Sequence, residues 1–140
     1  MTLYAESSAV LAWLLGEPAG ENVRRTLADA ETVVASDLTL VECERSLIRA
    51  RSSGHFTETH ISSAQSALRR VEAGWSLLRL GRDVIERARR PFPREPLRTL
   101  DALHLASALT AREALPDLAL LSLDRRIRAA GRELGLAVAP

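Results

Sequence analysis

The sequence is poor in the features that mark secreted, disulfide-bonded or membrane-spanning proteins. Its 140 residues include one cysteine, Cys43, so an internal disulfide and a cysteine zinc cluster are both excluded. The longest apolar run, Ala9 to Leu15, is much too short to span a membrane. No basic segment followed by an apolar core opens the chain, which argues against a secretory signal. We therefore expect a cytoplasmic protein with no membrane partner, folded as one domain over residues 1–140.

Lysine is absent, and all 19 cationic residues are arginine, although the formal net charge is only +1. Codon bias in a GC-rich genome is one explanation. Arginine also binds phosphate and carboxylate groups through paired hydrogen bonds, so a nucleic acid or an acidic partner stays open. The proline-containing stretch from Arg87 to Arg98 predicts a basic irregular loop, which is either simply solvated or in contact with RNA phosphates.

Strand and helix patterns alternate along the chain, which is typical of a parallel sheet covered by helices on both faces. Strands are expected at residues 2–5, 33–36, 75–80, 118–123 and 136–139. Helices are expected from 7 or 8 to 15, over 21–30, from 37 or 39 to about 54, and over 57–74, 84–88, 99–114 and 124–134. Ser7 or Ser8 is expected to cap the first helix, and Asp37 or Thr39 is expected to cap the third. The predicted fold class is α/β with a central, mainly parallel sheet.

Four acidic residues stand at the ends of apolar runs, where an uncompensated carboxylate is costly: Glu6, Glu42, Asp101 and Asp124. Glu6 and Asp124 follow the first and fourth strands, so both point to the sheet edge where ligands bind. Glu42 and Asp101 are expected in the first turns of their helices, where the helix dipole alone also accounts for an acid. If the fold gathers all four, the natural compensating charge is a divalent metal with oxygen ligands, Mg²⁺ or Mn²⁺.

The segments that carry these acids are, in order, YAESSAV, LTLVECERSL, LDALHLASAL and LLSLDRRIRAAGRELGL. Together they resemble the motifs of the PIN-domain ribonucleases, and most closely those of the VapC-like toxins of bacterial toxin–antitoxin pairs. The resemblance covers the whole chain. One departure is that Glu6 stands where the family usually has Asp.

The resemblance implies a three-layer α/β/α PIN-like domain whose acidic pocket binds Mg²⁺ or Mn²⁺ and hydrolyses RNA. Carried over by position, Glu6 and Asp101 would be the principal metal ligands, and Asp124 would bind directly or through water. Glu42 would bind a second ion or orient the attacking water, and Ser8 would hydrogen-bond within the acidic site. The resemblance also implies a homodimer that a cognate antitoxin protein inhibits, and we considered Trp13, Leu14 and Leu47 as candidate apolar surface for such contacts.

Three other polar residues lie near the acidic motifs. His104, one turn after Asp101, is interpreted as a hydrogen-bonded packing residue rather than as a ligand or proton shuttle. Arg45 and Arg49 follow Glu42 on one helical face, where they either bind RNA phosphates or pair with neighbouring acids.

Two alternatives to a toxin stay open. One is a PIN-type nuclease that serves RNA maturation or decay without an antitoxin. The other is a PIN-like scaffold that has lost catalysis and binds RNA or protein, in which case Glu6 would be the first sign of decay. The small size of the chain favours the toxin.

Overall fold

The computed structural model describes residues 1–140 and contains five strands in one sheet: β1 (Thr2–Ala5), β2 (Thr32–Ser36), β3 (Ser76–Leu78), β4 (Leu118–Leu121) and β5 (Ala137–Ala139). The strand order is β3-β2-β1-β4-β5, and every neighbouring pair is parallel. The predicted α/β class is therefore confirmed, with a sheet that is wholly rather than mainly parallel. The expected strand at 75–80 is shorter than predicted, because β3 lies at the sheet edge and pairs only with β2.

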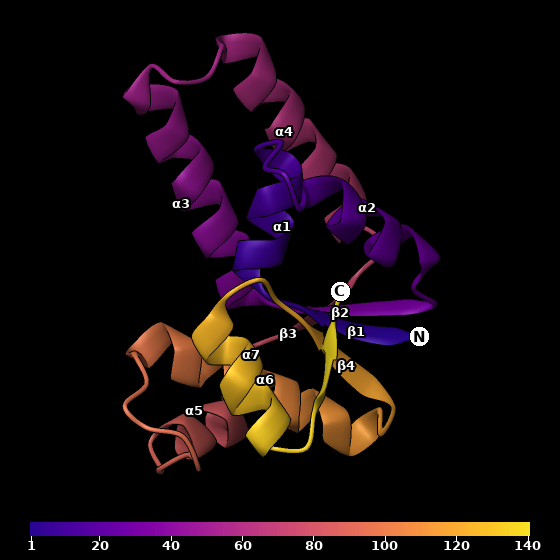
Figure 1. The fold of residues 1–140 in the computed structure, drawn as a ribbon, viewed down its shortest axis with the longest axis vertical. Coiled ribbons are helices and arrows are strands. Elements are labelled where there is room, and N and C mark those ends of the chain that lie inside the picture. The colour runs from indigo at the N-terminus through magenta and orange to yellow at the C-terminus, as the bar shows by residue number, and fades with distance from the viewer.

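Seven helices cover the two faces of the sheet: α1 (Ser7–Leu14), α2 (Gly20–Asp29), α3 (Asp37–Ser53), α4 (Glu58–Glu72), α5 (Arg82–Ala88), α6 (Thr99–Ala114) and α7 (Arg125–Glu133). Figure 1 shows the sheet edge-on, with α1 to α4 on one side and α5 to α7 on the other, which gives the three layers. None of these helices has the length and apolar character that crossing a bilayer requires.

The N-cap residues of two helices differ from the expected ones. Glu6, rather than Ser7 or Ser8, is the N-cap of α1, and its side chain accepts a hydrogen bond from the Ser8 amide. Ser36 caps α3 by accepting a hydrogen bond from the Leu38 amide, so this helix begins at Asp37. Glu42 consequently lies in the second turn of α3, where the helix dipole no longer accounts for an acid.

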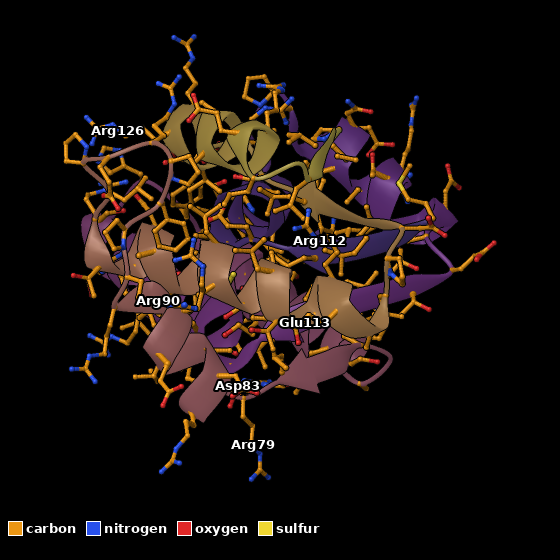
Figure 2. The ribbon with its side chains drawn as sticks, turned by 90° about the horizontal axis from the view of Figure 1, so that it is seen from below. Arg79, Asp83, Arg90, Arg112, Glu113 and Arg126 are labelled. Atoms are coloured by element: carbon orange, nitrogen blue, oxygen red, sulfur yellow. The ribbon has the colours of Figure 1, made fainter.

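The sheet divides the core into an upper part, on the side of α1 to α4, and a lower part, on the side of α5 to α7. Tyr4, Leu105, Leu120 and Ile127 belong to the cluster beneath the sheet, against α5 to α7. Figure 2 views this lower layer from below and shows Arg79, Asp83, Arg90 and Glu113, which are exposed charged residues, around α5 and α6.

Leu47 and Leu14 lie in the upper cluster, against α1, α3 and α4. The expectation that Leu14 and Leu47 offer interface surface is wrong, because both side chains are buried among these helices. The exposed apolar residues of α3 are instead Val41 and Ile48.

The direction in which successive strands are added to the sheet reverses next to β1. From β1 the sheet extends to β2 and β3 on one side and to β4 and β5 on the other. The carboxyl ends of β1 and β4 therefore form a topological switch point, the place where open parallel sheets bind their ligands. The Glu6 amide donates to the Leu121 carbonyl at 2.9 Å, so the two chain segments stay paired as they leave the sheet.

Candidate active site

Glu6 lies at this switch point, directly after β1, and is only 4% exposed. The Ser122 hydroxyl donates to Glu6 Oε2 at 2.7 Å, and the Ser8 hydroxyl donates to the same oxygen. The other oxygen, Oε1, accepts the Ser8 amide at 3.1 Å. These charge-assisted hydrogen bonds compensate the carboxylate for its loss of water.

Ser8 joins the start of α1 to the loop that precedes α7. Besides donating to Glu6, its Oγ accepts the backbone amides of Leu123 at 3.0 Å and Asp124 at 3.1 Å. The single hydroxyl therefore orders both segments that leave the switch point. It places Glu6 and the backbone of Asp124 on either side of one hydrogen-bonded group.

Asp101 and Asp124 are joined by the guanidinium of Arg98. Arg98 Nε donates to Asp101 Oδ2 at 3.1 Å, and Arg98 Nη2 lies 3.6 Å from Asp124 Oδ2. The hydrogen bond to Asp101 and the negative charges around it raise the pKa of Arg98. Asp101 is buried in the first turn of α6, as expected, whereas Asp124 is partly exposed and caps α7 through its Oδ1. The Arg98 side chain is 65% exposed.

Glu42 is held from α6 by His104. The His104 Nε2 lies 2.5 Å from Glu42 Oε1, and the Ser7 hydroxyl donates to the same oxygen at 2.8 Å. Burial raises the pKa of Glu42, but the hydrogen bonds from His104 and Ser7, with the positive charge of Arg49, outweigh it and lower the pKa overall. Glu42 is therefore an ionised carboxylate at neutral pH.

His104 also lies beside the first acid, since its Nε2 is 4.0 Å from Glu6 Oε1. Its other ring nitrogen, Nδ1, is 2.9 Å from the Tyr4 hydroxyl. His104 is buried and hydrogen-bonded, as predicted. The His104 ring is therefore hydrogen-bonded to the Glu42 carboxylate and lies within 4.0 Å of the Glu6 carboxylate.

The four acids thus form two pairs, each joined by one nitrogen-containing side chain, rather than one set of ligands around a single metal position. Glu6 and Glu42 meet at His104, and Asp101 and Asp124 meet at Arg98. No group of three or more His, Cys, Asp or Glu side chains is placed to hold a metal ion in this arrangement. The physical reason is that a guanidinium lies between two of the carboxylates, while hydroxyls and an imidazole engage the others.

The donor set nevertheless suits a hard cation. All four groups offer carboxylate oxygens, which Mg²⁺ and Mn²⁺ prefer, and four negative charges face one guanidinium and one imidazole. Because Arg98 is largely exposed, it can withdraw toward solvent and leave Asp101 and Asp124 to another cation. The residues therefore fit a divalent metal once Arg98 gives up its place.

The two arginines of α3 that we considered for RNA binding are both exposed. Arg49 Nη2 donates to Ser46 Oγ at 3.0 Å, and the charge of Arg49 lowers the pKa of Glu42. Arg45 forms no ion pair. Contact of either with RNA stays a prediction.

Sequence reasoning missed three residues of the site: Arg98, Ser122 and Ser7. Arg98 ends the basic loop and stands three positions before Asp101, a spacing at which helical side chains meet. This spacing was the available signal. Ser122 and Ser7 carried no comparable signal, because a serine beside a strand or at a helix start is ordinarily a cap or a turn residue.

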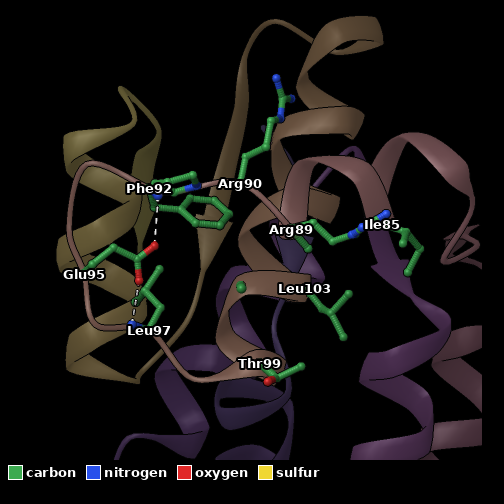
Figure 3. Close-up of a pocket in the computed structure, with 11 residues that line it drawn as sticks. Ile85, Arg89, Arg90, Phe92, Glu95, Leu97, Thr99 and Leu103 are labelled. Atoms are coloured by element: carbon green, nitrogen blue, oxygen red, sulfur yellow. Dashed lines mark hydrogen bonds between the residues drawn. The ribbon is translucent and has the colours of Figure 1, made fainter.

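The loop that delivers Arg98 is irregular, as predicted, and is ordered by a carboxylate. Glu95 accepts the amide of Phe92 at 2.9 Å and that of Leu97 at 2.8 Å, and both bonds are drawn in Figure 3. Beside this loop lies a cavity of about 570 Å³, which Thr99 and Leu103 of α6 help to line. None of the four acids lines this cavity. Asp101 belongs to α6 as well, but its side chain lies on another face of that helix.

Residues 3–133 match the family model described as the PIN domain. The chain is 36% identical over 137 residues to the ribonuclease VapC46 of Mycobacterium tuberculosis, which covers 97% of this chain and 95% of the relative. It is 31% identical over 139 residues to the ribonuclease VapC35 of the same species, which covers 97% of this chain and 94% of the relative. The resemblance seen in the four motifs is thereby confirmed.

Solved structures show the same fold. FitAcB from Neisseria gonorrhoeae superimposes with a TM-score of 0.70 at 15% identity, covering 100% of this chain and 97% of that chain. VapC20 of Mycobacterium tuberculosis, a toxin that cleaves the sarcin-ricin loop, gives 0.63 at 19% identity, covering 94% and 95%. At these identities the likeness concerns the architecture, and it agrees with the sheet order and layers described above.

Proposed function

Because the chain belongs to the PIN-domain family, we propose that it is a metal-dependent endoribonuclease of the VapC kind, which hydrolyses phosphodiester bonds in RNA. Homology to two proteins named ribonucleases, over nearly the full chain, supports this activity. The structural observation that carries the proposal is the burial of an ionisable carboxylate, Glu6, at the switch point, with Ser122 and Asp124 beside it. A carboxylate in that position is suited to a ligand rather than to packing.

In this proposal Mg²⁺ or Mn²⁺ would be held by Glu6, Asp101 and Asp124, with Glu42 as a further ligand or as the group that orients the attacking water. The bound ion would supply a more acidic water and positive charge for the phosphate. The resident groups do the rest. Ser8 fixes the direction of Glu6, and Glu42, kept ionised by its lowered pKa, can accept a hydrogen bond from water.

Arg98 must move away from Asp101 and Asp124 before a metal ion can bind these two carboxylates. While it bridges Asp101 and Asp124, it supplies the positive charge that the two carboxylates need. Turned outward, its guanidinium can bind an RNA phosphate through paired hydrogen bonds, next to the acids. Arg45 and Arg49 would extend this positively charged edge along α3.

We also propose that the protein forms a homodimer and is inhibited by an antitoxin protein. Val41 and Ile48 support the dimer, because they lie seven positions apart on α3 and are both exposed. An apolar cavity of about 240 Å³, lined by Trp13, Leu27 and Trp75 among others, offers a place for an antitoxin segment. The solitary RNA-processing nuclease would show neither contact.

The test is cleavage of RNA by the purified protein with Mg²⁺ or Mn²⁺ and with EDTA. We expect cleavage only with metal, and a melting temperature that rises with metal because only the folded chain gathers the carboxylates. Metal binding without cleavage of any RNA offered would favour the binding module. Neither a thermal shift nor cleavage at millimolar metal would contradict the proposal.

A further inference from the structure

A line of buried hydrogen bonds runs from the middle of the sheet to Glu42. Tyr4 lies on the central strand β1 and is completely buried, and its hydroxyl is 2.9 Å from Nδ1 of His104 on α6. The opposite nitrogen of that ring, Nε2, lies 2.5 Å from Oε1 of Glu42 on α3. One imidazole thus connects the sheet core to a carboxylate at the acidic site.

The direction of these bonds follows from the groups themselves. A phenol hydroxyl keeps its proton at neutral pH, so the Tyr4 hydroxyl can donate to Nδ1 of His104. An ionised carboxylate can only accept, so the proton between His104 and Glu42 sits on Nε2. With a partner at each ring nitrogen, the imidazole cannot flip without losing both bonds.

We propose that Tyr4 and His104 are positioning residues that hold the Glu42 carboxylate toward the other acids. Glu42 projects from a partly exposed position of α3, and its only other side-chain hydrogen bond comes from Ser7. Without the ring, the carboxylate would be free to turn toward solvent and Arg49. The proposal rests on the proposed function for the use made of Glu42, whereas the hydrogen-bonded line itself does not depend on it.

Packing alone does not explain this pair. His104 is flanked by Leu103 and Leu105, and an apolar side chain would fill its place without the cost of burying an imidazole. A phenylalanine would likewise fill the place of Tyr4. The Tyr4 hydroxyl and Nδ1 of His104 are hydrogen-bonded to each other, and the remaining ring donor, Nε2, binds Glu42. No buried side-chain nitrogen or oxygen lacks a partner.

The first test is the ring N–H of His104 in NMR spectra of the ¹⁵N-labelled protein without metal or RNA. We expect a protected Nε2–H signal that exchanges slowly with water and that is lost or strongly broadened in Tyr4→Phe. The control Thr110→Val removes a hydroxyl of α6 that bonds only to the Ala106 carbonyl, so this variant should keep the signal. His55, which is exposed, serves as the reference for an unprotected ring. An unchanged His104 signal in Tyr4→Phe would overturn the proposal.

The second test is Mn²⁺ affinity, measured by calorimetry without RNA. Loss of a hydrogen bond behind a metal ligand typically weakens binding tenfold or more, so we expect about a tenfold loss in Tyr4→Phe. His104→Leu should lose at least as much, and His104→Gln, which keeps an N–H donor, should recover part of it. Equal affinity in the Leu and Gln variants would overturn the proposal, even if Tyr4→Phe does not fold. If the wild-type protein binds no metal, the proposed function fails, while the Nε2–H signal still decides whether Tyr4 orients the ring.

Discussion

Glu6 and Asp101 are both buried acids of one site, but their charges are compensated in different ways. Glu6 receives hydrogen bonds from the hydroxyls of Ser8 and Ser122, on segments that leave paired strands of the sheet. Asp101 is paired with Arg98, a largely exposed guanidinium at the end of a loop. The hydroxyls leave the negative charge of Glu6 in place, whereas the guanidinium neutralises Asp101 until another cation replaces it.

This contrast separates a fixed half of the site from an exchangeable half. The fixed half, Glu6 with Glu42, is bound to the core through Ser122, His104 and Tyr4. The exchangeable half, Asp101 with Asp124, is bridged by a side chain that solvent and salt can reach. A metal therefore competes with hydrogen bonds of the fold in one half and with a movable cation in the other.

The largest effect should come from Asp101→Asn in the exchangeable half. The change removes a buried ligand charge at constant volume, and loss of several kcal/mol of metal-derived stabilisation corresponds to at least roughly a 100-fold fall in cleavage rate. Asp124→Asn should lower the rate less, since its oxygen still caps α7 and the residue is partly exposed. RNA cleavage rates at saturating Mn²⁺ provide the measurement. Full activity in both variants would refute the assignment of the site.

Glu6→Gln probes the fixed half and should have the next largest effect. The hydroxyls of Ser8 and Ser122 both donate to Oε2 of Glu6. If the glutamine NH₂ group takes the place of that oxygen, it faces two other donors, and at least one of these groups loses its hydrogen-bond partner. We expect weaker metal binding and a destabilisation of about 1–3 kcal/mol. Glu6→Asp retains the charge but draws it away from Ser122, so it should bind metal better than Glu6→Gln. Identical metal affinities for the two variants would show that Glu6 is not a ligand.

Arg98→Gln should have the opposite effect on the exchangeable half and strengthen metal binding there. Without the guanidinium, Asp101 and Asp124 no longer have a resident cation, and we expect Mn²⁺ to bind about two- to fivefold more tightly, an effect kept small by solvent and salt. Arg94→Gln is the matched control, because Arg94 pairs with Glu133 on the surface. Calorimetry at two salt concentrations should show the difference between the variants shrinking as salt rises. Weaker metal binding in Arg98→Gln would mean that the guanidinium supports the metal site.

The sequence alone was sufficient for the sheet, the layers and the neighbourhood of the acids. Glu6 and Asp124 follow buried apolar strands, and parallel strands bring their carboxyl ends to one edge. The compensation of these charges was not predictable, because it depends on contacts distant in sequence, such as Ser122 to Glu6 and His104 to Glu42. The N-cap of α3 was misjudged for a local reason. Asp37 and Thr39 were the expected caps, but Ser36, at the end of the preceding strand, can cap a helix as well, and its side chain accepts the Leu38 amide.

The smallest expected effect concerns the stability of the fixed half in acid. The pKa of Glu42 is lower in the folded protein than its ordinary value of 4.5, so ionised Glu42 favours the folded state. That contribution is fully present above the ordinary pKa and is lost as the pH falls through the lowered one. Glu42→Gln should therefore reduce the free energy of unfolding at neutral pH and converge with the wild type at strongly acidic pH. Denaturant unfolding in metal-free buffer at a series of pH values measures this convergence. Glu44→Gln, a change at a neighbouring acid of α3 that has no hydrogen bond to His104, is the control and should follow the wild-type curve. A Glu42→Gln curve parallel to the wild-type curve at every pH would mean that His104 and Ser7 do not stabilise the ionised carboxylate.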